Sequence, residues 1–239
     1  MKLIGVGVGP GDPELVTVKA VRILREADLV LVPVLAPDEA GRAESVVRAY
    51  TDRAERVVFA LNDRGGVTPR RAAAWEAAAE RVVRAFDEGA AAVAFATIGD
   101  PNVYSTFTYL SQTVRHRRPQ VAVQTVPGIT AMQDLAARSG TVLTEGTESL
   151  ALVSLTGGTG RLRTALACCD TVVAYKFGAV ADQVVAVLEE SGRLAGAVCG
   201  ARLGLPGQDV RPARELTGEV PYLSTLIAPA RRTAKGGKL

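Results

Sequence analysis

The 239-residue chain is poor in the residue types that most often carry metal binding and nucleophilic catalysis. It has a single histidine, His116, and three cysteines, of which Cys168 and Cys169 are adjacent and Cys199 stands alone. One histidine in a basic stretch does not suit a histidine-led zinc site or a Ser-His-Asp triad. The cysteine spacing gives neither a disulfide framework nor a C-x-x-C metal motif. We therefore expect no metal site, a solvated histidine and three buried free thiols.

Long hydrophobic runs are also missing. The composition is 48% apolar and 22% charged, and no stretch approaches the roughly 18 uninterrupted apolar residues of a membrane span. We expect no transmembrane helix and no membrane partner. Met1 and Lys2 lead directly into an apolar segment with no cleavage site behind it, so we expect a cytoplasmic protein.

An excess of positive charge is missing outside one end of the chain. The formal net charge is +3, but four cations in the segment 231–239 follow Glu219 with no acidic residue among them. A near-neutral body with a short basic tail is not typical of a DNA-binding face, so we expect no nucleic-acid partner. The tail is rich in glycine and lysine and is predicted to be flexible.

The first half of the chain alternates short apolar runs with segments of helical periodicity. The segment 68–89 has the clearest helix signals, because Thr68 is a suitable N-cap, Pro69 fits the first helical position and Gly89 fits the end. Strands that alternate with helices predict a mostly parallel sheet covered on both faces. The expected strands lie at 2–8, 28–34, 56–61, 91–97 and 121–126, and the expected helices at 13–27, 43–51, 68–89, 103–115 and after 127–130.

The second half has a different texture. Its last two strand-like runs have no helix between them, which predicts a mixed sheet with an antiparallel portion. We expect two α/β domains, at 1–140 and 141–230, followed by the tail at 231–239. The strand-like runs of this half are 149–155, 170–177, 196–203, 209–216 and 221–228.

The strongest local signal is a glycine-rich loop between the first strand and the first helix. A dinucleotide-binding loop is one interpretation, but Pro10 and Pro13 interrupt it and Asp12 would repel a pyrophosphate. It also lacks the Lys-Ser/Thr ending of a P-loop. For this loop alone, a tight turn without a ligand is a fair alternative. Its glycines are Gly5, Gly7, Gly9 and Gly11.

Two further loops follow apolar strands in the same way. Gly99, Asp100 and Pro101 come after the fourth expected strand, and Pro127 and Gly128 come after the fifth. Because the carboxyl ends of parallel strands form the ligand crevice of an α/β sheet, the three loops are expected to converge. Convergence favours a ligand site over three unrelated turns.

These loops resemble, in order and spacing, the tetrapyrrole methyltransferase family, whose members include uroporphyrinogen-III methyltransferase, corrin-ring methyltransferases and diphthine synthase. The resemblance covers nearly the whole chain and ends before the basic tail. Within the family, the chain is most similar to the precorrin-2 and cobalt-precorrin-2 C(20)-methyltransferases. The segments that carry this finer similarity are 99–110, 127–137, 172–178 and 221–227.

The resemblance implies a homodimeric tetrapyrrole methylase fold, with S-adenosylmethionine (SAM) bound in a cleft between two α/β domains and S-adenosylhomocysteine as product. Asp100 suits the hydroxyl or ammonium donors of SAM, because a carboxylate only accepts hydrogen bonds. The alternative role for Asp100 is an N-cap of a helix that starts at Val103, and the two roles are compatible. The implied SAM contacts are Pro10, Gly99, Asp100, Val103, Thr130, Ala131 and Tyr175, with Lys176 as an alternative to Tyr175.

The implied substrate is ringed by carboxylates and needs cationic donors. Arg70, Arg71 and Arg115 are candidates by chemistry, but only Lys176 and Arg202 fall at predicted strand ends. A lysine beside the sulfonium of SAM would be unfavourable, so we orient Lys176 toward substrate carboxylates. Helix packing is the preferred role for Tyr109. The expected substrate-binding residues are Tyr104, Ser105, Lys176 and Arg202.

The implied reaction needs little from the protein beyond positioning. The sulfonium is a good leaving group and the electron-rich ring is the nucleophile, so the enzyme has to align the two and exclude water. No catalytic residue is named, and the sequence leaves open whether the acceptor carries cobalt. Three alternatives stand: methylation of another ring carbon, a nucleotide-dependent dehydrogenase, which explains the first loop only, and a non-catalytic SAM-binding protein.

Overall fold

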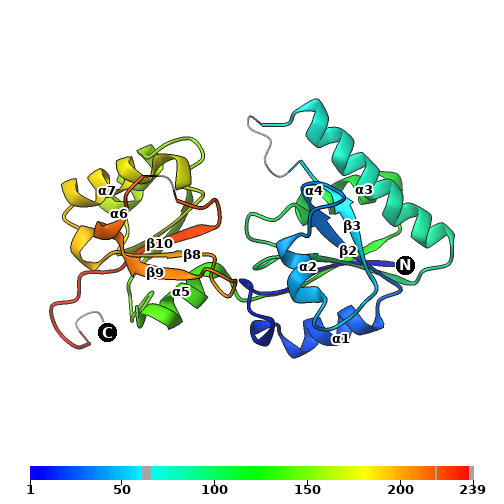
Figure 1. Cartoon of the computed structure of the whole chain (residues 1–239), viewed down its shortest axis with the longest axis horizontal. Coiled ribbons are helices and arrows are strands. Elements are labelled where there is room, and N and C mark those ends of the chain that lie inside the picture. The colour runs from blue at the N-terminus through cyan, green and yellow to red at the C-terminus, as the bar shows by residue number, and fades with distance from the viewer. Residues whose placement is uncertain (61–65, 219, 237–239) are drawn as a thin grey trace. The chain divides into compact units, whose positions relative to one another are not determined.

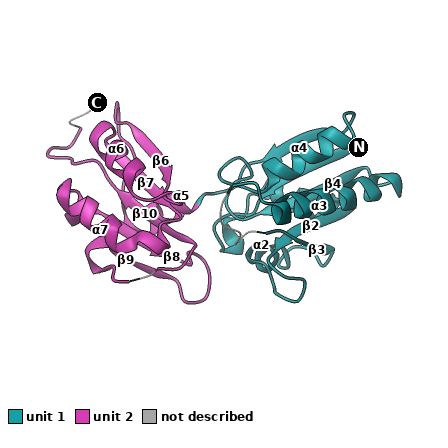
Figure 2. Ribbon diagram, turned by 90° about the horizontal axis from the view of Figure 1, so that it is seen from above, with its two compact units in different colours: residues 1–130 teal, residues 131–239 magenta. Residues whose placement is uncertain are grey.

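The structure is a computed structural model, and it describes residues 1–60, 66–218 and 220–236. The chain forms two compact units, Met1–Thr130 and Ala131–Leu239 (Figure 2). The domain boundary expected after residue 140 therefore falls later than the division between the units. The reason is that helix α5 (Ala131–Ser139) packs on strand β10 (Ser224–Ala228) of the second unit.

The first unit is built on a parallel sheet in the order β3-β2-β4-β1-β5. Helices α3 and α4 pack on one face of it, and α1 and α2 pack on the other (Figure 1). The doubly covered parallel sheet expected from the sequence is confirmed. The strands are β1 (Lys2–Gly7), β2 (Leu29–Val34), β3 (Ala54–Val58), β4 (Ala92–Thr97) and β5 (Ala122–Val126), and the helices are α1 (Val18–Glu26), α2 (Arg42–Val47), α3 (Pro69–Asp87) and α4 (Phe107–Arg117).

Capping residues explain where α1 and α3 begin. In α3 the hydroxyl of Thr68 accepts a hydrogen bond from the N–H of Arg71 at 3.1 Å, as expected for an N-cap. The single helix expected at 13–27 is wrong. The chain first makes a short 3-10 turn, η1 (Pro13–Leu15), and α1 starts only after Thr17, which caps it by accepting from the N–H of Ala20 at 3.2 Å.

The second unit has a mixed sheet in the order β6-β7-β10-β8-β9, in which only β6 and β7 pair in parallel. Helices α6 and α7 pack on one face and α5 on the other (Figure 1). The expected antiparallel portion is confirmed, although the run expected at 209–216 turns into a 3-10 segment after β9. The remaining elements are β6 (Leu150–Ser154), α6 (Gly160–Cys168), β7 (Thr171–Tyr175), η2 (Gly178–Val180), α7 (Ala181–Glu190), η3 (Leu194–Gly196), β8 (Val198–Ala201), β9 (Asp209–Pro212) and η4 (Ala213–Glu215).

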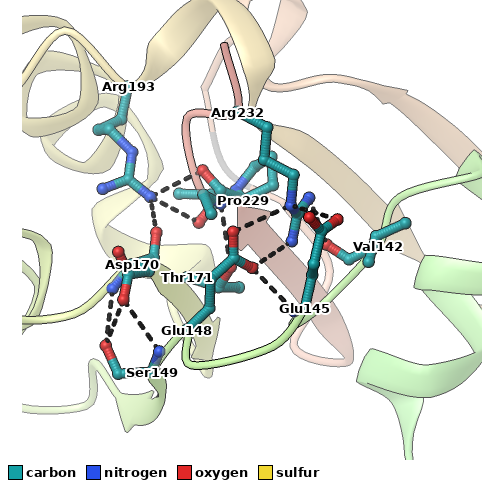
Figure 3. Close-up of polar contacts among 11 residues, drawn as sticks. Val142, Glu145, Glu148, Ser149, Asp170, Thr171, Arg193, Pro229 and Arg232 are labelled. Carbon is teal, nitrogen blue, oxygen red and sulfur yellow. Dashed lines mark hydrogen bonds and ion pairs between the residues drawn. The ribbon is translucent and has the colours of Figure 1, made fainter. Parts of the chain in front are cut away.

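A group of polar contacts fixes the chain after β10 to the second unit (Figure 3). The Nε of Arg232 donates to Glu148 at 3.0 Å and lies 3.5 Å from a carboxylate oxygen of Glu145. The side chain of Glu148 is only 1% exposed, so Arg232 supplies the charge that this buried carboxylate requires. Arg193 donates to the carbonyl oxygens of Ala228 at 3.1 Å and Pro229 at 2.7 Å. We call these residues the C-terminal clamp.

The tail expected at 231–239 is thus held at its start. Besides the contacts of Arg232, Arg231 donates to the carbonyl oxygens of Ser191, at 2.8 Å, and Gly192. Residues 237–239 lie outside the described part of the chain. The basic character of residues 231 and 232 therefore serves packing within the second unit.

A second buried carboxylate lies in α2 of the first unit. Glu44 accepts hydrogen bonds from Arg56 at 2.7 Å, Arg48 at 3.2 Å and the N–H of Gly41 at 3.3 Å. Burial acts to raise the pKa of Glu44, but the hydrogen bonds from Arg56, Arg48 and Gly41 outweigh it and hold the pKa below its usual value.

The single histidine and the three cysteines differ in how far they are buried. His116 is exposed, as expected. Cys199 is buried, and burial raises the pKa of its thiol to about 12. The expectation of a buried thiol is wrong for Cys168, which is exposed at the end of α6, and Cys169 is only partly buried. In the described ranges, no helix is both long and apolar enough to cross a bilayer.

Candidate functional site

The three special loops of the first unit follow three neighbouring strands. Strands β4, β1 and β5 lie side by side and in parallel, so their loops leave the same edge of the sheet. The N–H of Gly99 donates to the carbonyl oxygen of Gly9 at 2.7 Å. The N–H of Val8 donates to the carbonyl oxygen of Thr97 at 3.0 Å. The first and second loops are therefore hydrogen-bonded to each other.

The third loop joins them through glycines, and we call Gly7, Gly99 and Gly128 the glycine junction. A Cβ added to Gly7 would lie 2.6 Å from both the nitrogen of Gly128 and the carbonyl oxygen of Gly99. A Cβ on Gly128 would collide with the same oxygen. Gly99 differs, because it has a φ of +69° and nothing lies within 4 Å of where its Cβ would be. Two glycines thus allow backbone contact, and the third presents an open side.

Asp100 ties the second loop to the third. Its residue is 9% exposed, and its two carboxylate oxygens accept from the N–H of Asn102 at 2.8 Å and from the N–H of Gly128 at 3.0 Å. The interpretation of Asp100 as a helix N-cap is wrong, because α4 begins at Phe107. Each oxygen keeps a second lone pair that a ligand donor can use.

The segment between Asp100 and α4 explains why the helix starts later than expected. Tyr104 has a φ of 50°, which a helix does not allow, and the residue is 48% exposed. The hydroxyl of Ser105 donates to Thr97 at 3.1 Å and accepts from the N–H of Phe107 at 3.1 Å. Val103 is partly buried. Ser105 therefore anchors the start of α4, whereas Tyr104 is partly exposed.

The other candidates of this unit are less well placed. Tyr109 stacks on Trp75 with ring centroids 4.4 Å apart, which agrees with helix packing. Arg71 donates to the carbonyl oxygen of Gly66 at 2.7 Å, so its guanidinium supports its own loop. Arg115 lies in the last turn of α4, at the opposite edge of the sheet from the loops, and is not brought to the site. Arg70 is exposed near the start of α3.

The expected cofactor contacts beyond the loops gather at the start of α5. The N–H of Met132 donates to the hydroxyl oxygen of Tyr175, the last residue of β7, at 3.0 Å. Thr130, which is 7% exposed, and Ala131 directly precede this contact in the chain. Pro10 is buried in the first loop. The structure therefore brings Ala131 and Tyr175 together within the second unit.

Lys176 and Arg202 share an unusual backbone conformation. Their φ values are 57° and 52°, and with Tyr104 they are the non-glycine residues of the described chain that have positive φ. This conformation is costly for a residue with a Cβ, and it concentrates at functional sites. No sequence signal revealed it, because positive φ is normally marked by Gly, Asn or Asp.

Comparison with known proteins supports a single family. The model of the "Tetrapyrrole (Corrin/Porphyrin) Methylases" matches residues 2–217. The precorrin-2 C(20)-methyltransferase of Sinorhizobium sp is 32% identical over 237 residues, which cover 95% of each chain. The cobalt-precorrin-2 C(20)-methyltransferase of Salmonella typhimurium is 30% identical over 229 residues, again 95% of each chain.

A longer relative and a solved structure complete the comparison. The cobalamin biosynthesis protein CobIJ of Mycobacterium tuberculosis is 34% identical over 96% of this chain, but the match covers 46% of that protein, so the chain spans about half its length. The uroporphyrin-III C-methyltransferase of Thermus thermophilus, solved with S-adenosylhomocysteine, has the same fold, with a TM-score of 0.65, 24% identity and coverage of 95% of this chain and 97% of that one. The chain belongs to the tetrapyrrole (corrin/porphyrin) methylase family.

Proposed function

We propose that the protein is a SAM-dependent methyltransferase of cobalamin biosynthesis that methylates C(20) of precorrin-2 or cobalt-precorrin-2. The observation that carries the proposal is the glycine junction, which brings three loop backbones together beside the open side of Gly99. The two whole-length relatives named C(20)-methyltransferases support the choice of ring carbon. The mycobacterial relative CobIJ, which is about twice as long, carries no position in its name and leaves other ring carbons as the alternative.

The residues of the loops fit the chemistry of SAM. Its ribose hydroxyls and ammonium group are donors that the remaining lone pairs of Asp100 can accept, and its adenine edge can pair with backbone groups. The open side of Gly99 allows a ligand to approach the backbone. We therefore propose as SAM-binding residues Pro10, Gly99, Asp100, Val103, Thr130, Ala131 and Tyr175.

The protein contributes positioning rather than a nucleophile. When bound, SAM would supply an activated methyl group for a tetrapyrrole carbon, with S-adenosylhomocysteine as the leaving group. The residues of the chain hold the two in line and exclude water. Lys176 and Arg202 are proposed to hold substrate carboxylates, and Tyr104 and Ser105 to border the ring. For Ser105 this role is indirect, because its hydroxyl is already bonded to Thr97 and Phe107.

Incubation of the full chain with SAM and either metal-free or cobalt-loaded precorrin-2 tests the proposal. Mass spectrometry should show the gain of one methyl group in one or both acceptors, together with S-adenosylhomocysteine. Titration calorimetry with SAM and with NAD separates the rivals. Tight NAD binding without SAM binding would indicate a dehydrogenase, and SAM binding without turnover would indicate a non-catalytic protein.

We also propose that the enzyme works in the cytoplasm and that it is a homodimer, the latter because the family resemblance implies it. Light scattering of the purified chain tests the dimer: a mass of two chains is expected, and a monomer at working concentrations would contradict it.

A further inference from the structure

A tyrosine from outside the three loops is hydrogen-bonded to the end of the first of them. Tyr50 lies between α2 and β3, and its hydroxyl donates to the carbonyl oxygen of Pro13 at 2.5 Å, 37 residues away in the sequence. Helices α1 and α2 pack on the same face of the first sheet, which brings the residues after α2 within reach of the loop before α1 (Figure 1). The bond therefore joins this loop to a separate part of the first unit.

The accepting carbonyl group belongs to the short turn η1, in which the first loop ends. The N–H of Val16 donates to the same Pro13 oxygen at 3.1 Å, and the N–H of Leu15 donates to the carbonyl oxygen of Asp12 at 3.1 Å. The oxygen of Pro13 thus accepts one hydrogen bond from within the turn and one from Tyr50, which uses both of its lone pairs. No residue of η1, which lies wholly within the described part of the chain, is buried, so burial alone does not fix its position.

The position of η1 affects where the backbone of the first loop lies. Gly9 has a φ of +76°, and a Cβ added there would lie 3.1 Å from the carbonyl oxygen of Leu15. The carbonyl group of Gly9 accepts the hydrogen bond from Gly99 that joins the first two loops. Pro10, a proposed SAM contact, directly follows Gly9 and is buried. A shift of η1 would therefore be passed through Gly9 to Pro10.

Tyr50 itself is held by the end of α2. Its N–H donates to the carbonyl oxygen of Val47 at 2.9 Å, and Val47 is fully buried. Arg48 donates to the carbonyl oxygen of Asp52 at 3.0 Å and to the buried carboxylate of Glu44 at 3.2 Å, so the chain on both sides of Tyr50 is fixed to the helix. Tyr50 is thus a fixed point to which η1 is attached.

We propose that Tyr50 is a positioning residue for SAM, which holds η1 and so keeps the first loop in the conformation that binds the cofactor. The inference rests on the proposed function, in which Pro10 contacts SAM. Tyr50 acts through the carbonyl group of Pro13. A loop that is already ordered loses less conformational entropy on binding, and any fraction of the protein with a displaced loop raises the apparent dissociation constant.

Replacing Tyr50 with phenylalanine removes only the hydroxyl group and keeps the ring. In titration calorimetry Tyr50→Phe should bind SAM about fivefold more weakly, which is the loss expected for one hydrogen bond of ordinary net strength. Asp28→Ala is the matched control, because it removes the acceptor of the N–H groups of Ala91 and Ala92, both at 2.9 Å, at the opposite edge of the same sheet. It should lower the free energy of unfolding of the first unit without changing SAM affinity.

The Michaelis constants separate a positioning role from a general loss of stability. In methyl transfer to precorrin-2, Tyr50→Phe should raise the Michaelis constant for SAM about fivefold. The Michaelis constant for the tetrapyrrole and the turnover at saturating SAM should stay close to those of the wild type, because bound SAM restores the order of the loop. A melting temperature that falls while the Michaelis constant for SAM stays at its wild-type value would overturn the inference.

Hydrogen exchange gives a readout that needs no ligand. The N–H groups of Leu15 and Val16 are bonded to carbonyl groups of the turn, so their exchange rates in the free protein, measured by nuclear magnetic resonance, report how often the turn opens. Both should exchange about fivefold faster in Tyr50→Phe than in the wild type, but at the wild-type rate in Asp28→Ala, since local opening does not require global unfolding. Unchanged exchange in Tyr50→Phe would mean that the tyrosine does not hold the turn.

These measurements distinguish a failure of the inference from a failure of the proposed function. If the wild type methylates precorrin-2 and Tyr50→Phe does so with an unchanged Michaelis constant for SAM, the positioning role is wrong and the enzyme assignment stands. If hydrogen exchange follows the expected pattern but the wild type binds no SAM, the proposed function fails together with the role of Tyr50 toward SAM, and only the fixing of η1 by Tyr50 stands.

Discussion

Replacing Asp100 tests how the three loops are held together. Asp100→Ala removes the acceptors of the Asn102 and Gly128 N–H groups, which are bonded at 2.8 and 3.0 Å in a site where Asp100 is 9% exposed. A donor left without a partner costs about 1–3 kcal/mol, so with two such donors the free energy of unfolding of the first unit should fall by about 2–6 kcal/mol. SAM affinity should fall by about 1–3 kcal/mol as the loops loosen and one ligand acceptor is lost.

Trp75 is the only tryptophan and lies in the first unit, so its fluorescence during urea unfolding reports on this unit. Asp100→Asn is expected to fall between wild type and Asp100→Ala, because its amide oxygen replaces one acceptor only. Asp12→Ala is the matched control, since Asp12 accepts from Glu14 at 2.9 Å in an exposed hydrogen bond. An Asp100→Ala protein within about 0.5 kcal/mol of wild type, with unchanged SAM affinity, would refute this role for the carboxylate.

Three further outcomes follow from buried groups. Arg232→Ala should lower the free energy of unfolding of the second unit by about 2–4 kcal/mol, because it leaves the 1%-exposed Glu148 without its main cation, as circular dichroism during urea unfolding can show. Because the pKa of Glu44 is lowered in the folded protein, ionised Glu44 should stabilise the fold above about pH 4.3, and this stabilisation should be lost as the pH falls through the folded pKa. Glu44→Gln should flatten this part of the curve of unfolding free energy against pH. At neutral pH a thiol reagent should modify Cys168 readily and Cys199 only on unfolding, since burial raises the pKa of Cys199 to about 12; equal rates would contradict the structure.

Much of the fold could be predicted because local patterns and tertiary structure agree in it. Each apolar run of the first half is a strand of one parallel sheet that has helices on both faces, and α3 carries its own start signals in Thr68 and Pro69. The expected convergence of the loops needed only the rule that parallel strands end at one edge. The glycine at every second position of the first loop pointed to close backbone approach, and Gly7 shows it.

The predictions from sequence fail where long-range contacts or a strained backbone determine the local structure. Tyr104 takes a positive φ without any of the usual residue types, and this delays α4 to Phe107. Glu148 and Arg232 are hydrogen-bonded in the structure but far apart in sequence. The sequence therefore predicted a flexible tail where Arg232 is in fact held. Asp is a common helix-capping residue, which suggested a cap at Asp100. Its second carboxylate oxygen instead accepts from the N–H of Gly128 in another loop, and local sequence does not reveal such a contact.

The central claim is methylation at C(20), and the position of the new methyl group tests it most directly. The full chain is incubated with precorrin-2 or cobalt-precorrin-2 and with SAM that carries an isotopically labelled methyl group, and the product is examined by nuclear magnetic resonance. The account predicts one labelled methyl group bonded to the C(20) bridge carbon. A labelled methyl group on any other ring carbon, or unlabelled substrate recovered alongside intact SAM, would contradict it.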